Sequence, residues 1–290
     1  MSEMLSGARP AWLLVTAVLV PAIAFDARAG DDESSGATAD APVADVDEDV
    51  LELLQTLEAQ HAEIDRFTAK ITYQTWDAVL ERTESQLGSL AYEVNREDDA
   101  RRFAVEFTER ALGRRRIEER KRYAFSGSWL AEYDYQSRMF IKRQIVPPGE
   151  QFDPLKLGEG PFPMPIDQRV EDVLARFEVE QIDPPDDGLL TAERIGEVYG
   201  LRLVPRSDTV EAEDFSRIDI FYDRRTWLPA GINAFGAEPV GEDEQRGRYN
   251  RTTVWLRDIE VDGEIDEEFL SVETPDRRQW DIEIREWQDR

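Results

Sequence analysis

Residues 67–74, FTAKITYQ, alternate apolar and polar side chains with a period of two. This alternation is typical of a strand with one face in the core and the other in solvent. The same pattern recurs at 103–107 and 129–135, and further candidate strands lie at 86–94, 117–125, 138–146, 197–205, 216–223, 229–235, 251–261 and 280–287. Short polar turns separate most of these segments. The sequence therefore predicts a meander of antiparallel strands with one apolar face.

An amphipathic helix is predicted ahead of the first strand. Its apolar stripe has helical spacing: Val50, Leu54, Leu57, His61 and Ile64. His61 is the single histidine of the chain, and its position on this stripe favours a structural role over a catalytic one. A Ser-His-Asp triad would have to use it, and no G-x-S-x-G motif accompanies it. We therefore expect no catalytic residues, no cofactor and no metal site.

The segment 147–177 interrupts the meander. It opens with Pro147-Pro148-Gly149, continues as PLKLGEGPFPMPI, and ends in a predicted helix over 167–177. One face of this helix carries four apolar side chains, Val170, Val173, Leu174 and Phe177. Two interpretations are equally compatible with this pattern: a lid over the sheet, or an ordinary helix that plugs the open end of a half-barrel.

The N-terminal residues resemble an export signal. The apolar run AWLLVTAVLVPAIAF (11–25) follows Arg9 and ends shortly before Ala27-Arg28-Ala29, a small-x-small cleavage pattern. We expect a signal peptide at 1–29, a disordered acidic linker at 30–47 and one folded domain at 48–290. A lipid anchor after cleavage would need a cysteine, and the chain has none. The expected location is the periplasm, without lipid anchoring.

Composition narrows the possible functions further. The 35 basic and 63 acidic residues give a formal net charge of −28. The electrostatic field of this negative charge repels nucleic acid and bare anionic membranes. It also discourages self-association, so we expect a monomer. Without cysteine there is no disulfide, no thiol catalysis and no Cys-ligated zinc.

Two charged features are candidate sites. In the strand 129–135, Glu132 and Asp134 are expected to face outward, away from the aromatic face, and no carboxylate pair stands out as a hydrolase site. The segment 110–122, RALGRRRIEERKR, is rich in arginine. It could dock an anionic headgroup or an acidic partner, or it could be a solvated hairpin whose cations pair with nearby carboxylates. We favour the second interpretation.

The order of these motifs resembles the outer-membrane lipoprotein carrier (LolA-like) superfamily. FTAKITYQ resembles its first strand, and Gly88–Tyr92 its G-x-L second strand. SGSWLAEYDYQSRMF (126–140) is similar to its DG-x-x-LW-x-Y hairpin. LRLVPR (201–206) and FLSVETPD (269–276) follow in the family's order, so the similarity extends over residues 48–285.

The resemblance implies an unclosed antiparallel β-barrel, a curved sheet of about 10–11 strands lidded by a few helices. Such proteins enclose acyl chains in an apolar cavity, and this implies a periplasmic lipid or lipoprotein carrier working towards the outer membrane. Its partners would be an acylated lipoprotein or lipid and membrane-bound donor and acceptor proteins. The expected cavity walls are Phe103, Val105, Phe107, Trp129, Tyr133 and Tyr135. The expected lid residues are Val170, Val173, Leu174 and Phe177.

The chain departs from the family at one point. An Arg-Pro pair follows the family's second strand, and its arginine helps to hold the lid. Here the arginine position is Val94 and no proline follows, so the candidate latch residues are Arg96, Arg101 and Arg102. Two alternative functions stay open: a lipid-sensing or protein-interaction module on the same fold and, less favoured, a secreted carboxylate hydrolase.

Overall fold

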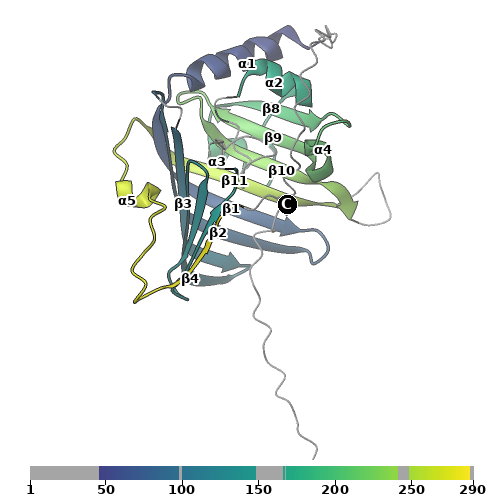
Figure 1. Ribbon diagram of the computed structural model, residues 1–290. Helices are drawn as coiled ribbons and strands as arrows, with labels where there is room; N and C mark the ends of the chain where they lie inside the picture. Colours follow the sequence, from purple (N-terminus) through teal and green to yellow (C-terminus); the bar gives the residue numbers. More distant parts are fainter. Residues whose placement is uncertain (1–45, 98–99, 148–165, 167, 241–247, 288–290) are drawn as a thin grey trace, which may run out of the picture. The chain divides into compact units, whose positions relative to one another are not determined.

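The computed structural model describes residues 46–97, 100–147, 166, 168–240 and 248–287 (Figure 1). The signal peptide and most of the acidic linker therefore lie outside the described residues. So do most of the loop 147–165 and residue 167.

One curved sheet of twelve strands dominates this part of the chain (Figure 1). The first six strands are β1 (Arg66–Asp77), β2 (Arg82–Asn95), β3 (Ala100–Leu112), β4 (Arg115–Ser126), β5 (Trp129–Asp134) and β6 (Met139–Gln144). The other six are β7 (Phe177–Ile182), β8 (Val198–Pro205), β9 (Phe215–Asp223), β10 (Pro229–Val240), β11 (Arg248–Val261) and β12 (Asp281–Arg285).

The sheet consists of two antiparallel meanders, β1–β6 and β7–β11, joined by the antiparallel pair β1–β11. β12 adds to β6 in the parallel direction. The strand order is β12-β6-β5-β4-β3-β2-β1-β11-β10-β9-β8-β7, and within the described residues the edge strands β7 and β12 do not pair with each other. The predicted unclosed antiparallel barrel is confirmed. The strand that was not predicted is β7, which begins at Phe177, the expected last residue of the lid helix.

Five helices occur in the described ranges: α1 (Glu48–His61), α2 (Val170–Arg176), α3 (Ala192–Ile195), α4 (Glu211–Asp214) and α5 (Glu267–Leu270). Asp47 caps α1, because its side chain accepts a 3.0 Å hydrogen bond from the backbone N–H of Asp49. The negative charges of Glu48 and Asp49 in the first turn also interact favourably with the positive end of the helix dipole. The helix buries Val50, Leu54, Leu57 and His61 of the predicted stripe, and Ile64, which completes it, is buried just after the helix ends.

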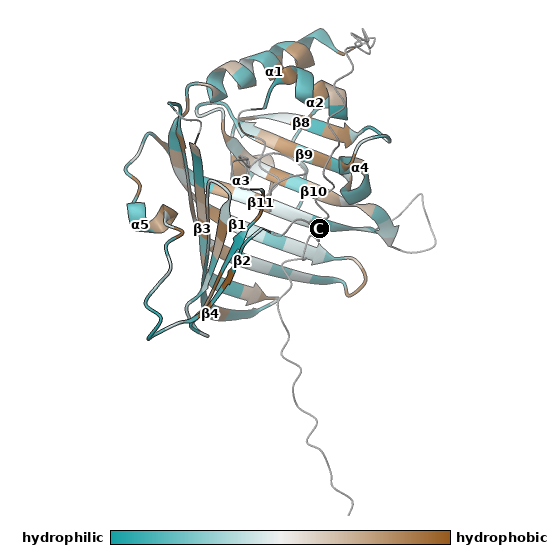
Figure 2. Cartoon of the chain, in the orientation of Figure 1, coloured by the Kyte–Doolittle hydropathy of each residue, from teal (hydrophilic) through white to brown (hydrophobic). Residues whose placement is uncertain are grey.

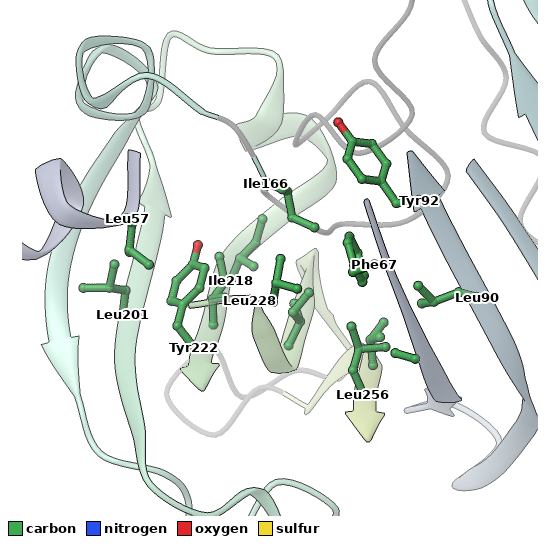
Figure 3. Close-up of a cluster of buried hydrophobic side chains, with 14 of the residues drawn as sticks. Leu57, Phe67, Leu90, Tyr92, Ile166, Leu201, Ile218, Tyr222, Leu228 and Leu256 are labelled. Carbon is green, nitrogen blue, oxygen red and sulfur yellow. The ribbon is translucent and has the colours of Figure 1, made fainter. Parts of the chain in front are cut away.

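The sheet has two differently covered faces. We call the face that carries the main apolar cluster the inner face; it is built from cross-strand neighbours such as Phe67 and Tyr92, or Leu201 and Ile220. α1 contributes Leu57 to the same cluster, close to Leu201 (Figure 3). Apolar colour on the sheet is broken by polar strips, as alternating strands require (Figure 2).

The opposite, outer face of β2–β6 is covered by residues 263–280, which contain α5 and lead into the edge strand β12. Four alanines, one on each of β2 to β5, leave room for it: Ala91, Ala104, Ala124 and Ala131. The hydroxyl of Tyr133 donates to the carbonyl oxygens of Ser271 (3.1 Å) and Glu273 (2.8 Å). The C-terminal part of the chain therefore seals the outer face of this meander.

Candidate functional site

The inner face and the helices above it form one continuous apolar region. Val173 and Phe177 are buried in the main cluster, while Val170 and Leu174 pack at its margin. The four expected lid residues thus all face the inner side of the sheet. The helix that carries three of them is shorter than predicted, since α2 spans Val170–Arg176.

Polar contacts anchor α2 at both ends. At its start, the Glu58 carboxylate of α1 accepts a 3.2 Å hydrogen bond from the backbone N–H of Val170. At its end, Arg206 Nε donates to the carbonyl oxygen of Leu174 at 3.1 Å. The strongest tie is Arg176, whose guanidinium lies 2.7 Å from a carboxylate oxygen of Glu211 on α4.

Sequence reasoning missed the Arg176–Glu211 pair. Arg176 could have been noticed as a basic residue in the last turn of the lid helix. No pattern in the sequence indicates that Glu211 would be only 3% exposed and lie next to it.

The three candidate latch arginines have different surroundings. Arg96 binds the end of α1 and the residues after it, since its NH2 group donates to the carbonyls of His61 (3.3 Å) and Ile64 (3.0 Å) and its Nε lies 2.7 Å from Asp65. Arg102 lies on the outer face, where it pairs with Glu93 and with Glu267 of α5. Arg101 lies on β3 opposite Val94. The contacts given for Arg96 and Arg102 do not involve α2, and those of Arg96 tie the end of α1 to the turn between β2 and β3.

The expected wall residues divide between the two faces. Phe103, Val105 and Phe107 lie in the inner cluster and are 0–5% exposed. Tyr133 and Tyr135 lie on the outer face against the C-terminal segment, with Trp280. Trp129 shares their face, where the Lys142 ammonium lies 4.8 Å from its ring centroid.

The prediction that all six residues line one cavity wall is therefore wrong, because three of them lie on the outer face. The period of two in 129–135 is right, but its phase is inverted: Leu130, which the prediction omitted, packs against the inner cluster. Its cross-strand partner Phe125 and the nearby Tyr73 and Tyr123 complete this part of the inner face. Aromatic side chains do not reveal which face of the strand points inward, because aromatic side chains are buried on both faces of this sheet.

The inversion also corrects the placement of the two carboxylates. Glu132 lies opposite Tyr123 and Ile141 on the inner side and pairs with Arg143. Asp134 lies 3.6 Å from Lys121, which also pairs with Glu119 at 2.9 Å. Beyond its apolar part, the inner face thus has a charged margin.

Tyr123 lies between the apolar part and this margin, and its surroundings disfavour the phenolate. Burial, followed by the negative charges of Glu119 and Asp134, raises the pKa of Tyr123 to about 12. Because the folded-state pKa is raised, the stabilisation is complete below the unfolded pKa of about 10 and is lost as pH rises towards 12.

Tyr123→Phe should remove one phenol that ionises well above pH 10 in the folded protein. Spectrophotometric titration of the phenolate band, compared between the two proteins, measures this. The variant should also lose less stability than the wild type between pH 10 and 12. If the phenol that disappears in the Tyr123→Phe variant titrates near pH 10, the raised pKa of Tyr123 is wrong.

The arginine-rich hairpin forms local ion pairs. Arg110 lies 2.6 Å from Glu84, Arg120 lies 3.0 Å from Glu106, and Arg116 lies 3.2 Å from Glu109. This is the pairing with surrounding carboxylates that the sequence favours. Neighbouring carboxylates therefore neutralise much of the positive charge of 110–122.

His61 is buried in a structural position. Its Nε2 lies 2.8 Å from the carbonyl oxygen of Trp227, so this nitrogen carries the hydrogen in that contact. Within the described ranges, no group of three or more His, Asp or Glu side chains is placed to hold a metal ion. No described helix is long and apolar enough to cross a membrane.

No protein-family model matches the chain, and no curated protein matches it either. Several solved structures are similar. MucB is 12% identical with a TM-score of 0.41, and the match covers 77% of this chain and 62% of MucB. An uncharacterised conserved protein of Thermus thermophilus is 10% identical with a TM-score of 0.43, covering 82% of this chain and all of that one (100%).

A third similar structure is a Vibrio parahaemolyticus domain proposed to act in outer-membrane lipoprotein sorting. It is 11% identical with a TM-score of 0.31, and the match covers 75% of this chain and 94% of that domain. All these likenesses are distant, so the functional proposal rests on the geometry of the inner face.

Proposed function

We propose that this protein is an exported carrier that shields acyl chains between the inner face of the sheet and the helices α1 and α2. The observation that carries the proposal is the continuity of one apolar cluster. It extends from α1 and α2 across the inner faces of β1–β4 and β8–β11. The same region has a charged margin, and an amphiphile with an apolar tail and a polar head matches such a gradient.

The physical need for such shielding is large. Each CH₂ group that leaves water gains about 0.8 kcal/mol, so a multiply acylated passenger cannot cross an aqueous compartment unprotected. The inner face offers aromatic and branched aliphatic side chains, which suit an acyl chain. A carrier, rather than an enzyme, needs no more chemistry than this.

Loading requires α2 to move. Phe103 and Val105 are only 2% and 0% exposed, so an acyl chain reaches them only if covering groups withdraw. α2 has seven residues. Isolated helices shorter than about 12 residues are marginal in water, so α2 depends on its packing and its polar anchors. A helix held in this way suits a lid that must open for uptake and release.

We place the carrier in the periplasm, where membrane-bound donor and acceptor proteins would exchange its cargo. The sequence pattern at 11–29 supports export, and the absence of cysteine supports a protein without its own lipid anchor.

The direct test is native mass spectrometry of the exported protein, followed by organic extraction and lipid analysis. We expect bound acylated lipid, or uptake of a synthetic triacylated lipopeptide added to the purified protein. A protein that holds no lipid and takes up no lipopeptide would overturn the proposal and favour an interaction module on the same fold.

A matched pair of variants tests the inner face itself. Leu130 and Trp129 are adjacent, both are half-buried, and they face opposite sides of β5. Leu130→Asp should lower lipopeptide occupancy several-fold, because it places a charge among apolar groups. Trp129→Asp should leave occupancy unchanged. Thermal unfolding of both variants controls for stability, and equal loss of binding in both would contradict the assigned face.

A further inference from the structure

The turn between β1 and β2 presents two adjacent apolar side chains to solvent. Val79 is 68% exposed and Leu80 is 61% exposed. In the hydropathy view this turn is the brown tip that projects from the sheet (Figure 2). Single exposed apolar residues are ordinary, but an adjacent pair at the end of a projecting hairpin forms a ready contact for an apolar phase.

The turn has a defined conformation. Asp77 Oδ1 accepts hydrogen bonds from the backbone N–H groups of Val79 and Leu80, both at 2.9 Å. Asn250 Oδ1 accepts a third, from Ala78, also at 2.9 Å. Glu81 pairs with Arg248 of β11. These contacts order the backbone before any partner arrives, so insertion of the two side chains costs little conformational entropy.

Arginine and aromatic side chains lie beside the tip on the outer face. Arg217, Phe235, Arg251 and Trp76 are successive cross-strand neighbours on β9, β10, β11 and β1. The Arg217 guanidinium lies 3.9 Å from the Phe235 ring centroid. Arg251 Nε is buried and has no hydrogen-bond partner among the described residues. Tryptophan and arginine are the side chains that settle at the boundary between bilayer headgroups and acyl chains.

We propose that this hairpin tip docks the protein on a zwitterionic bilayer surface. Val79 and Leu80 enter the boundary between headgroups and acyl chains, and Arg251 and Trp76 lie at the level of the lipid phosphates. The net charge of −28 opposes adsorption to an anionic surface, so binding depends on apolar insertion and is stronger on zwitterionic than on anionic lipid. This surface is distinct from the inner face and does not depend on the carrier proposal.

Flotation of the full chain with phosphatidylcholine–phosphatidylethanolamine vesicles tests the proposal. The double change Val79→Ser with Leu80→Ser should weaken binding by about tenfold or more. The control is Met139→Ser with Ile284→Ser, which removes two apolar side chains that are each 43% exposed, on β6 and on the edge strand β12 at the far end of the same meander. Arg251→Gln should weaken binding by less than the double change.

The proposal is overturned if the wild type does not float with these vesicles, or if the tip variant and the control lose binding equally. Binding that requires a reconstituted membrane protein would also overturn it and would assign the tip to a protein partner. Lipopeptide uptake, measured on the same variants, should be unchanged, so failure here is distinguishable from failure of the carrier proposal.

Discussion

Replacing Arg176 by alanine should destabilise the protein by about 3 to 5 kcal/mol and expose the lid helix. The Glu211 carboxyl group, which is only 3% exposed, would lose the guanidinium that pairs with it. The Arg176 guanidinium would also no longer lie over the Phe177 ring, whose centroid is 5.4 Å from the guanidinium carbon. Urea unfolding measures the loss, and amide hydrogen exchange in 170–176 measures the opening of α2.

Two further proteins make this test specific. Arg169→Ala, at the other end of the same helix, removes a 63% exposed arginine that pairs with Glu171 and Asp172, and should leave stability close to that of the wild type. The double variant Arg176→Met with Glu211→Leu removes both charges and should recover most of the lost stability. If Arg176→Ala is as stable as Arg169→Ala, the buried pair does not hold the lid.

Gly88→Ala should be the most disruptive single-methyl change in the sheet. A Cβ at this position would lie 1.9 Å from the carbonyl oxygen of Glu106 and 2.9 Å from the Cα of Phe107, both backbone atoms of β3. The β2–β3 register shifts here, between Leu87 and Gly88, so the strands approach closely. Relief would require the paired backbones to separate, and we expect a loss of about 3 kcal/mol or more.

Gly236→Ala is the matched control for this change. Gly236 also lies in a strand beside a register shift, but its added Cβ would have no neighbour nearer than 3.6 Å. Its effect should stay within about 0.5 kcal/mol. Thermal and urea unfolding of both variants measure the difference. Equal stability of the two would show that β2 and β3 are not as close as the structure places them.

The position of Gly88 also illustrates what sequence analysis achieved. The resemblance identified 88–92 as a second strand with a leading glycine, and the structure places this strand next to β1. The steric reason for the glycine became visible only when β3 was paired against it. Likewise, sequence analysis placed Val170, Val173, Leu174 and Phe177 on one apolar face, which packs on the inner cluster, whereas Arg176 and Glu211, 35 positions apart, came together only through tertiary packing.

The sequence by itself determined the elements of this protein, because period-two and helical spacing are local properties of the chain. From them followed eleven of the twelve strands, the N-terminal helix and the helix before β7, whereas the unclosed form of the sheet was implied by the family resemblance. The tertiary structure decided which face of each strand is the inner one. Residues 263–280 cover the outer face of β2–β6, so Tyr133 is shielded there and Leu130 turns inward. That choice depends on burial by a segment more than a hundred residues away in the sequence, and alternation within a strand carries no information about it.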